Sequence, residues 1–268
     1  MNARLVLLSV LALSLATAGH ALDFGGLSKG LDMLNKAKAA KSTLDDANKM
    51  VSGIGPEEER ALGETVALEI IGKFGGLVRD EETMHRVNLV GHALARYSAR
   101  PDHAWRFGVL NSDTVNAFSA PDGYVFITRG LYQTATDDDR LAAILGHEIS
   151  HITGRHALRI IETGEKSSVL MKHVSSRSGD VRQVDAYLNQ VGLNTEKIVK
   201  FLVEKGFDHP TEFAADQNGR DLAAVTGYAP NGLRTVLEDL QARKGDAQAV
   251  FSTHPPLAER IKRLPGGR

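Results

Sequence analysis

The segment HEISH at residues 147–151 constrains this chain more than any other feature. Residues four apart project from one face of an α-helix, so on a helix His147 and His151 can bind one metal ion together. Glu148 borders the same face. Apolar residues flank the motif in the stretch LAAILGHEISHITGRHALRII, so we expect this helix to be buried. Burying two histidines and a glutamate without partners would be costly, and a shared metal ion removes that cost.

The amino-acid composition limits the kinds of metal ligand and nucleophile that this chain can use. The chain of 268 residues contains no cysteine, which excludes disulfides, thiolate metal ligands and a cysteine nucleophile. Any metal ion must therefore be held by His, Asp or Glu. Lys and Arg total 32 against 33 for Asp and Glu. This near balance argues against electrostatic binding to polyanions, so we expect no nucleic-acid partner.

A catalytic zinc ion needs a third protein ligand and one position open to water. In metzincins that ligand is a histidine at the position that Ala157 occupies in this chain. The nearby His156 would point away from the metal on an unbroken helix. The metzincin arrangement is therefore excluded, and a glutamate from a later helix is the alternative.

Glu212 is the glutamate that best suits this role. Within the apolar segment EFAAD it has an acidic residue four positions later, Asp216, and this spacing places both carboxylates on one helix face. One can bind the metal while the other orients a ligand histidine or serves the reaction. The later glutamates that lack such a partner within an apolar helical segment are Glu162, Glu165, Glu196, Glu204, Glu238 and Glu259. The sequence thus predicts one Zn²⁺ per chain, held by His147, His151 and Glu212.

The N-terminus has the layout of a secretory signal peptide over residues 1–21. Arg4 precedes an apolar stretch at residues 5–18, and small residues allow cleavage after Ala18 or Ala21. The alternative is an uncleaved anchor, but the stretch is too short to span a bilayer, which takes about 20 residues. No later segment approaches a membrane span, so we expect a periplasmic protein without a transmembrane segment in its mature chain.

After a linker or leader at residues 22–55, a single domain is expected over residues 56–268. Pro56 and the three glutamates after it are typical of a helix start. The motif helix is predicted over residues 138–162, opened by a capping box at Thr136. Three strand-like runs precede it, at residues 105–110, 115–120 and 123–128. The turn Pro121-Asp122-Gly123 predicts a hairpin of the last two runs. Residues 116–120 are expected to form an edge strand beside the site.

Four motifs together resemble the HtpX and CAAX-prenyl-protease family of zinc metallopeptidases, a gluzincin family. They are NAFSAPDGYVFITRGL, HEISH, EFAAD and STHPPLAER, in this order, and the similarity covers about residues 57–264. The membrane-integral branches of that family carry transmembrane helices, so this chain looks closer to its soluble periplasmic branch. One departure is Ala214, where the family's E-x-E-A-D pattern has a second glutamate.

The resemblance implies an α+β, zincin-like fold, mostly helical, with a small antiparallel sheet packed on the HEISH helix. It implies a zinc metalloendopeptidase with His147, His151 and Glu212 as zinc ligands. Glu148 would be the general base, and Asp216 a proton donor or a histidine-orienting acid. The residues themselves support the first four roles, because water on zinc has a pKa near about 7 and Glu148 can accept its proton.

Family and location together suggest unfolded or misassembled envelope proteins as substrates, and an association with the envelope assembly machinery. The alternative is a non-catalytic chaperone or binding module that keeps zinc for stability. Glu148 favours the enzyme, because a structural zinc ion needs no base and tends to close its fourth position.

His254 is a further catalytic candidate. Two prolines follow it in STHPPLAER, and they place it on a stiffened loop that resembles a segment near the family's active site. Two interpretations stay open. His254 either occupies the fourth metal position in a self-inhibited state or stabilises the oxyanion during turnover. Arg260 would then anchor the loop or bind charge near Asp216.

Overall fold

The structure, a computed structural model, describes residues 54–163, 195–243 and 253–265. The predicted signal peptide and nearly all of the segment 22–55 lie outside the described residues. The described part is mostly helical and contains a three-stranded sheet, so the predicted α+β class is confirmed.

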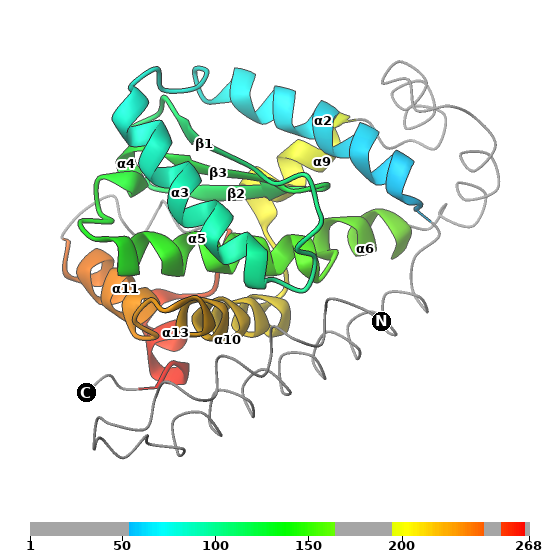
Figure 1. Cartoon of the computed structure of the whole chain (residues 1–268). Coiled ribbons are helices and arrows are strands. Elements are labelled where there is room, and N and C mark those ends of the chain that lie inside the picture. The colour runs from blue at the N-terminus through cyan, green and yellow to red at the C-terminus, as the bar shows by residue number, and fades with distance from the viewer. Residues whose placement is uncertain (1–53, 164–194, 244–252, 266–268) are drawn as a thin grey trace, which may run out of the picture. The chain divides into compact units, whose positions relative to one another are not determined.

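Figure 1 shows the sheet between α2 and α5, with α10 below α5. The strands are β1 (Arg106–Leu110), β2 (Ala117–Ala120) and β3 (Tyr124–Thr128). The helices are α2 (Pro56–Lys73), α3 (Glu81–Tyr97), α4 (Arg129–Tyr132), α5 (Asp138–Thr153), α6 (His156–Thr163), α9 (Thr195–Lys200), the π-helix η1 (Phe201–Lys205), α10 (His209–Thr226), α11 (Gly232–Ala242) and α13 (Leu257–Arg263).

Local chemistry sets the helix starts. Pro56 occupies the first turn of α2, and the glutamates after it face the positive end of the helix dipole. Asp80, Asp137 and Asp208 cap α3, α5 and α10, because each carboxylate accepts a hydrogen bond from the backbone N–H three residues later. The cap of the motif helix is thus Asp137 and not the predicted Thr136, since the helix begins one residue later than that pattern indicates.

The single helix predicted over residues 138–162 is wrong, because the structure divides it into α5 and α6. Gly154 caps α5, and Arg155 has a φ of 54°, in the left-handed region that no helix interior uses. The Arg155 guanidinium lies 2.8 Å from a carboxylate oxygen of the buried Glu59 in α2. We attribute the break to this ion pair, which offsets the unfavourable backbone and lets α6 start in a new direction at His156.

The sheet has the order β1-β3-β2 and is mixed. β2 and β3 form the predicted antiparallel hairpin, with Asp122 and Gly123 at φ values of 60° and 89° in its turn. β1 adds a parallel pairing to β3, which corrects the expectation of a purely antiparallel sheet. Pairing between distant strands leaves no trace in local alternation, so the sequence pattern could not give its direction. β2 lies at an edge of this sheet, as predicted.

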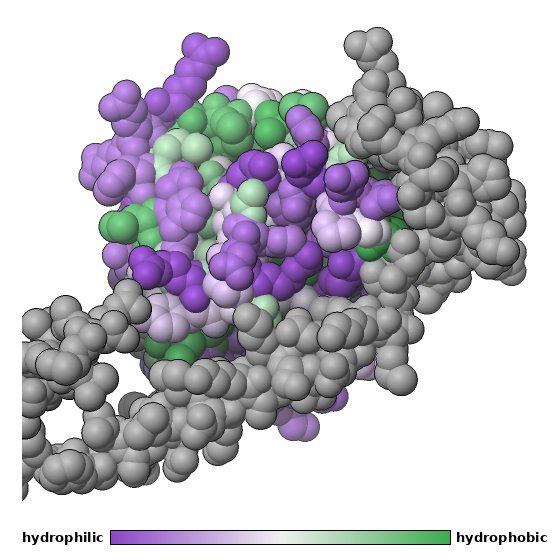
Figure 2. Space-filling model, turned by 45° about the vertical axis from the view of Figure 1, so that its right-hand side comes forward, coloured by the Kyte–Doolittle hydropathy of each residue, from purple (hydrophilic) through white to green (hydrophobic). Residues whose placement is uncertain are grey.

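Both faces of the sheet are covered by apolar side chains. Phe118 and Phe126 belong to the cluster around α2, whereas Val125 and Ile127 belong to the cluster that includes α5, as strand alternation requires. The surface in view in Figure 2 is largely hydrophilic, with apolar groups gathered near its upper edge. None of the described helices is long and apolar enough to cross a membrane.

Candidate metal centre

Close packing of α5 on α10 brings the predicted ligands together. Gly146 and Gly219 meet where the two helices cross. A Cβ on Gly219 would lie 2.6 Å from the backbone nitrogen of His147, and one on Gly146 would lie 2.9 Å from the carbonyl oxygen of Gly219. Any larger residue at these positions would push the helices apart. The two glycines therefore set the helix separation that places the carboxylates of α10 beside the histidines of α5.

The three predicted ligands converge on one point. Nε2 of His147 lies 3.0 Å from Nε2 of His151. The two nitrogens lie 3.5 Å from the Oε2 and Oε1 oxygens of Glu212, respectively. Donors about 2.0–2.1 Å from a tetrahedral zinc ion are about 3.3 Å apart, so the observed distances of 3.0 and 3.5 Å are close to those around such an ion.

The burial of Glu212 supports the same conclusion. Its side chain is 0% exposed, and Oε1 accepts no hydrogen bond from any residue that the structure describes. An unsatisfied carboxylate oxygen in the interior is costly unless a cation occupies the adjacent space. Two imidazoles and one carboxylate suit a divalent metal ion. The residues present therefore fit the implied metal.

Asp216 lies behind His147 rather than at the metal position. Its Oδ1 is 2.9 Å from Nδ1 of His147, and Arg260 donates two hydrogen bonds to its carboxylate, at 2.6 and 2.9 Å. Burial alone would raise the pKa of Asp216, but the charge and hydrogen bonds of Arg260 hold it well below its usual range. Asp216 is thus a carboxylate at neutral pH. This state suits an acid that orients His147, and the alternative role of Asp216 as a proton donor stays a prediction.

The carboxylates also determine the charge preference of His147. Burial lowers its pKa, but hydrogen bonding to Asp216 and Glu212 outweighs burial and raises the pKa to about 10. The surroundings of Nε2 therefore favour a positive charge, whether that charge comes from a proton or from a metal ion.

Glu148 borders the cluster from the sheet side. Its side chain is buried, and burial raises its pKa above the ordinary glutamate value. Ligand atoms of His147, Glu148 and His254 all lie within 4.8 Å of one another. A carboxylate with a raised pKa at this position is suited to taking and returning a proton.

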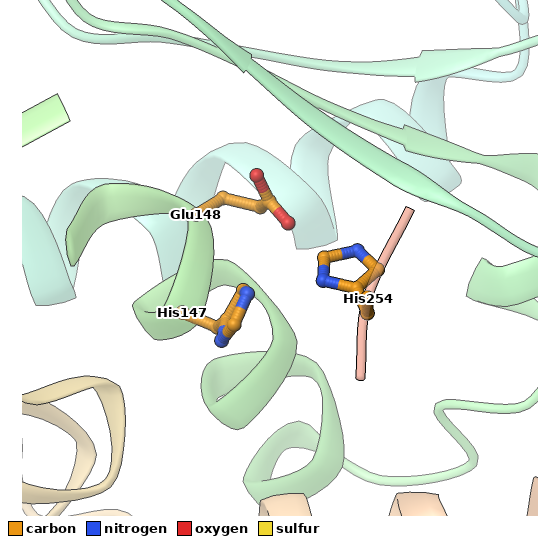
Figure 3. A group of neighbouring side chains, drawn as sticks. All are labelled: His147, Glu148 and His254. Carbon is orange, nitrogen blue, oxygen red and sulfur yellow. The ribbon is translucent and has the colours of Figure 1, made fainter. Parts of the chain in front are cut away.

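His254 reaches the site from the segment before α13. Its Nδ1 contacts Oε2 of Glu212, and its ring centroid lies 5.3 Å from that of His147. Figure 3 shows His254 facing Glu148 and His147 of α5 from this separate segment. The π-helix η1 ends at Gly206, which has a φ of 69° and whose added Cβ would lie 1.7 Å from the carbonyl oxygen of Thr253. Gly206 therefore allows the segment to pass this close.

Two pockets lie on either side of the Glu148–His254 pair, and both share Ala117 of β2. The first, of about 330 Å³, is lined mainly by the apolar residues Leu131, Ile144, Leu233, Val236 and Leu237. The second, of about 290 Å³, is lined by Ser119, His151, Leu202, Gly206, Phe207, Glu212 and Thr253. The edge strand β2 thus borders a depression on each side of the base.

His156 is the site residue that sequence reasoning missed. The expectation of an unbroken helix that carries His156 away from the site is wrong, because the helix breaks before His156 and brings it to the far side of the His151 ring. Its Nδ1 lies 2.9 Å from Nδ1 of His151. Burial, reinforced by the charge of Arg159, lowers the pKa of His156 to about 4. The signal available in the sequence was Gly154, since a glycine within a helical pattern can mark a helix end.

Comparison with known proteins agrees with this centre. The model of peptidase family M48 matches residues 81–267. The chain belongs to peptidase family M48. The matched residues include all of the cluster described above, and the resemblance drawn from the four sequence motifs is confirmed at the level of the family.

Several curated proteins are similar to the chain. It is 27% identical over 212 residues to the mitochondrial metalloendopeptidase OMA1 of Schizosaccharomyces pombe, covering 77% of this chain and 60% of the relative. It is 24% identical over 242 residues to the β-barrel assembly-enhancing protease of Escherichia coli, covering 87% and 46%. Metalloprotease YcaL of Escherichia coli is 26% identical over 159 residues, covering 59% and 60%. The chain thus spans about half to three fifths of these relatives.

Proposed function

We propose that this protein is a zinc-dependent metalloendopeptidase. The observation that carries the proposal is the buried cluster of His147, His151 and Glu212, in which the two Nε2 atoms lie 3.0 Å apart and each lies 3.5 Å from one carboxylate oxygen of Glu212. Glu148 beside them supplies the base that a purely structural site does not need. Membership of family M48 and the names of the relatives support this activity.

Glu148 and Asp216 have different roles in the proposed hydrolysis. Zinc, when bound, lowers the pKa of a bound water and polarises the substrate carbonyl. Glu148 would accept a proton from the attacking water and pass it to the leaving amine, a role that its raised pKa suits. Oδ1 of Asp216 lies 2.9 Å from Nδ1 of His147 and favours a proton on that nitrogen, which leaves Nε2 of His147 for the metal.

The edge strand β2 offers a binding surface for the substrate backbone. An extended peptide that pairs with β2 would pass Ala117 and Ser119, both of which line pockets beside Glu148. Because folded proteins seldom present a long extended segment, this mode of binding favours unfolded chains. It agrees with the proposed substrate class of unfolded or misassembled envelope proteins.

The proposed site of action is the periplasm, together with an association with the envelope assembly machinery. The signal-peptide pattern over residues 1–21 and similarity to a protein named β-barrel assembly-enhancing protease support this proposal. Intact-mass measurement of the protein recovered from the periplasm tests the export step. A mass that begins after Ala18 or Ala21 is expected, whereas a mass that includes Arg4 would contradict export with cleavage.

The activity itself is tested with casein, an unfolded protein. We expect cleavage that stops when a chelator removes the metal and returns when Zn²⁺ is added back. The alternative function, a zinc-containing chaperone or binding module, predicts that the loaded protein suppresses aggregation of an unfolded client and produces no fragments. Fragment analysis of one reaction therefore separates the two functions.

A further inference from the structure

The two ligand histidines are supported by different partners. Nδ1 of His147 faces the carboxylate of Asp216 at 2.9 Å, whereas Nδ1 of His151 faces Nδ1 of His156 at 2.9 Å. We infer that His156 is a positioning residue, which accepts a hydrogen bond from Nδ1–H of His151 and thereby aims Nε2 of His151 at the metal. This inference rests on the proposed metal site.

The direction of this hydrogen bond follows from the position of the metal. Nε2 of His151 faces Nε2 of His147 and a carboxylate oxygen of Glu212, so it is the nitrogen that must offer its lone pair. A neutral imidazole that gives one nitrogen to a metal carries its proton on the other. Nδ1 of His151 is therefore the donor, and Nδ1 of His156 is the acceptor. His156 then carries its own proton on Nε2.

The helix break at Gly154 and Arg155 places His156 where it can contact His151. Gly154 leaves room for the imidazole, because a Cβ at that position would lie 2.3 Å from Nε2 of His156. Arg155 holds the left-handed turn through its contacts with Glu59 Oε2 and the Ile54 carbonyl oxygen, each at 2.8 Å. On a continuous helix, His156 would project about 140° away from His151, out of reach of its ring.

Phe207 completes the support of His151. Its ring stacks on His151 with a centroid distance of 4.4 Å and an interplanar angle of 19°, and it meets the edge of His156 at 5.7 Å. Stacking restricts the tilt of the His151 ring, while the hydrogen bond to His156 restricts rotation within the ring plane. The two contacts together leave one orientation of Nε2.

The test is the affinity of the full-length protein for Zn²⁺, measured by competition with a chromophoric chelator. His156→Leu removes the acceptor, and we expect it to weaken zinc binding by about 10–100-fold, the usual effect of losing such a partner. His156→Asn keeps an acceptor oxygen near the position of Nδ1, and we expect it to restore most of that loss. His85→Asn, an exposed histidine on α3, is the matched control and should bind zinc as the wild type does.

Gly154→Ala provides a second variant that leaves His156 chemically intact. Gly154 has φ −77° and ψ −5°, a conformation that alanine adopts freely, so the added methyl group acts mainly by displacing the His156 ring. We expect a loss of zinc affinity in the same direction as in His156→Leu. Urea unfolding of each metal-free variant shows whether a loss of affinity reflects a loss of folding instead.

The outcomes separate this inference from the proposed function. Equal zinc affinity in wild type and His156→Leu overturns the positioning role, even if casein is cleaved. Equal weakening in His156→Leu and His156→Asn overturns it too, because the acceptor would then not matter. If His156→Leu fails to fold, Gly154→Ala and His156→Asn decide. The expected order of affinities in a protein that cleaves nothing would support the inference and contradict the protease.

Discussion

Replacement of Arg260 by leucine should destabilise the protein strongly. Arg260 and Asp216 are 2% and 3% exposed, and two hydrogen bonds of 2.6 and 2.9 Å join them. A hydrogen bond to a charged group contributes about 1.5–3 kcal/mol, and breaking a buried ion pair from one side costs about 3–5 kcal/mol. We therefore expect Arg260→Leu to lower the free energy of unfolding by about 3–5 kcal/mol.

Urea unfolding of the metal-free protein measures this change. Lys73→Met is the matched control, because Lys73 and Glu204 form an exposed pair at 3.5 Å that should contribute no more than about 1 kcal/mol. The double variant Arg260→Leu with Asp216→Leu should recover much of the stability, since no charge is then left buried alone.

The double variant also separates stability from metal binding. It removes the acceptor for Nδ1 of His147, so its zinc affinity should fall by about 10–100-fold although its fold is largely restored.

A loss of unfolding free energy below about 1 kcal/mol in Arg260→Leu would refute the reasoning. A double variant as unstable as the two single changes combined would also refute it, because the cost would then not come from an uncompensated charge.

Three further changes test other parts of the account. Glu212→Gln should sharply weaken zinc binding, because an amide oxygen replaces a charged ligand; metal analysis after dialysis that gives wild-type zinc content would contradict the ligand assignment. His254→Ala should raise basal casein cleavage, because His254 lies against Glu212 and Glu148 where a substrate must approach, whereas a loss of about 10²–10³-fold would indicate an oxyanion donor. Glu59→Gln should reduce the loss of unfolding free energy at acid pH. Burial raises the pKa of Glu59, but hydrogen bonds from His103 and Arg100 and the nearby positive charges outweigh burial and lower the pKa from 4.5 to about 2. The native state therefore gains about 3 kcal/mol above about pH 4.5 and loses it as the pH falls toward about 2, which urea unfolding as a function of pH can measure.

Much of the candidate site could be predicted because its residues follow helical periodicity. His147 and His151 are four residues apart on α5, as are Glu212 and Asp216 on α10, and this spacing alone places each pair on one face. The burial of both helices could also be expected from their apolar flanks. The contact of His254 with Glu212 could be anticipated only through the family resemblance.

The features that could not be predicted depend on contacts between distant parts of the chain. Arg155 adopts a left-handed conformation beside Glu59, which lies far away in sequence, and no local pattern reports that pairing. Without it, the apolar period continues through Gly154 and indicates one long helix. The same limit explains the parallel pairing of β1 with β3, since strand direction within a sheet is set by the whole topology.

The central claim is that a zinc ion held by His147, His151 and Glu212 works with Glu148 as the base. The most direct measurement compares zinc content and casein cleavage in wild type and Glu148→Gln. The account predicts one zinc ion per chain in both proteins and a rate about 10²–10⁴-fold lower in the variant. Equal cleavage by the two proteins would contradict the assigned base, and bound zinc without cleavage by either would contradict the protease itself.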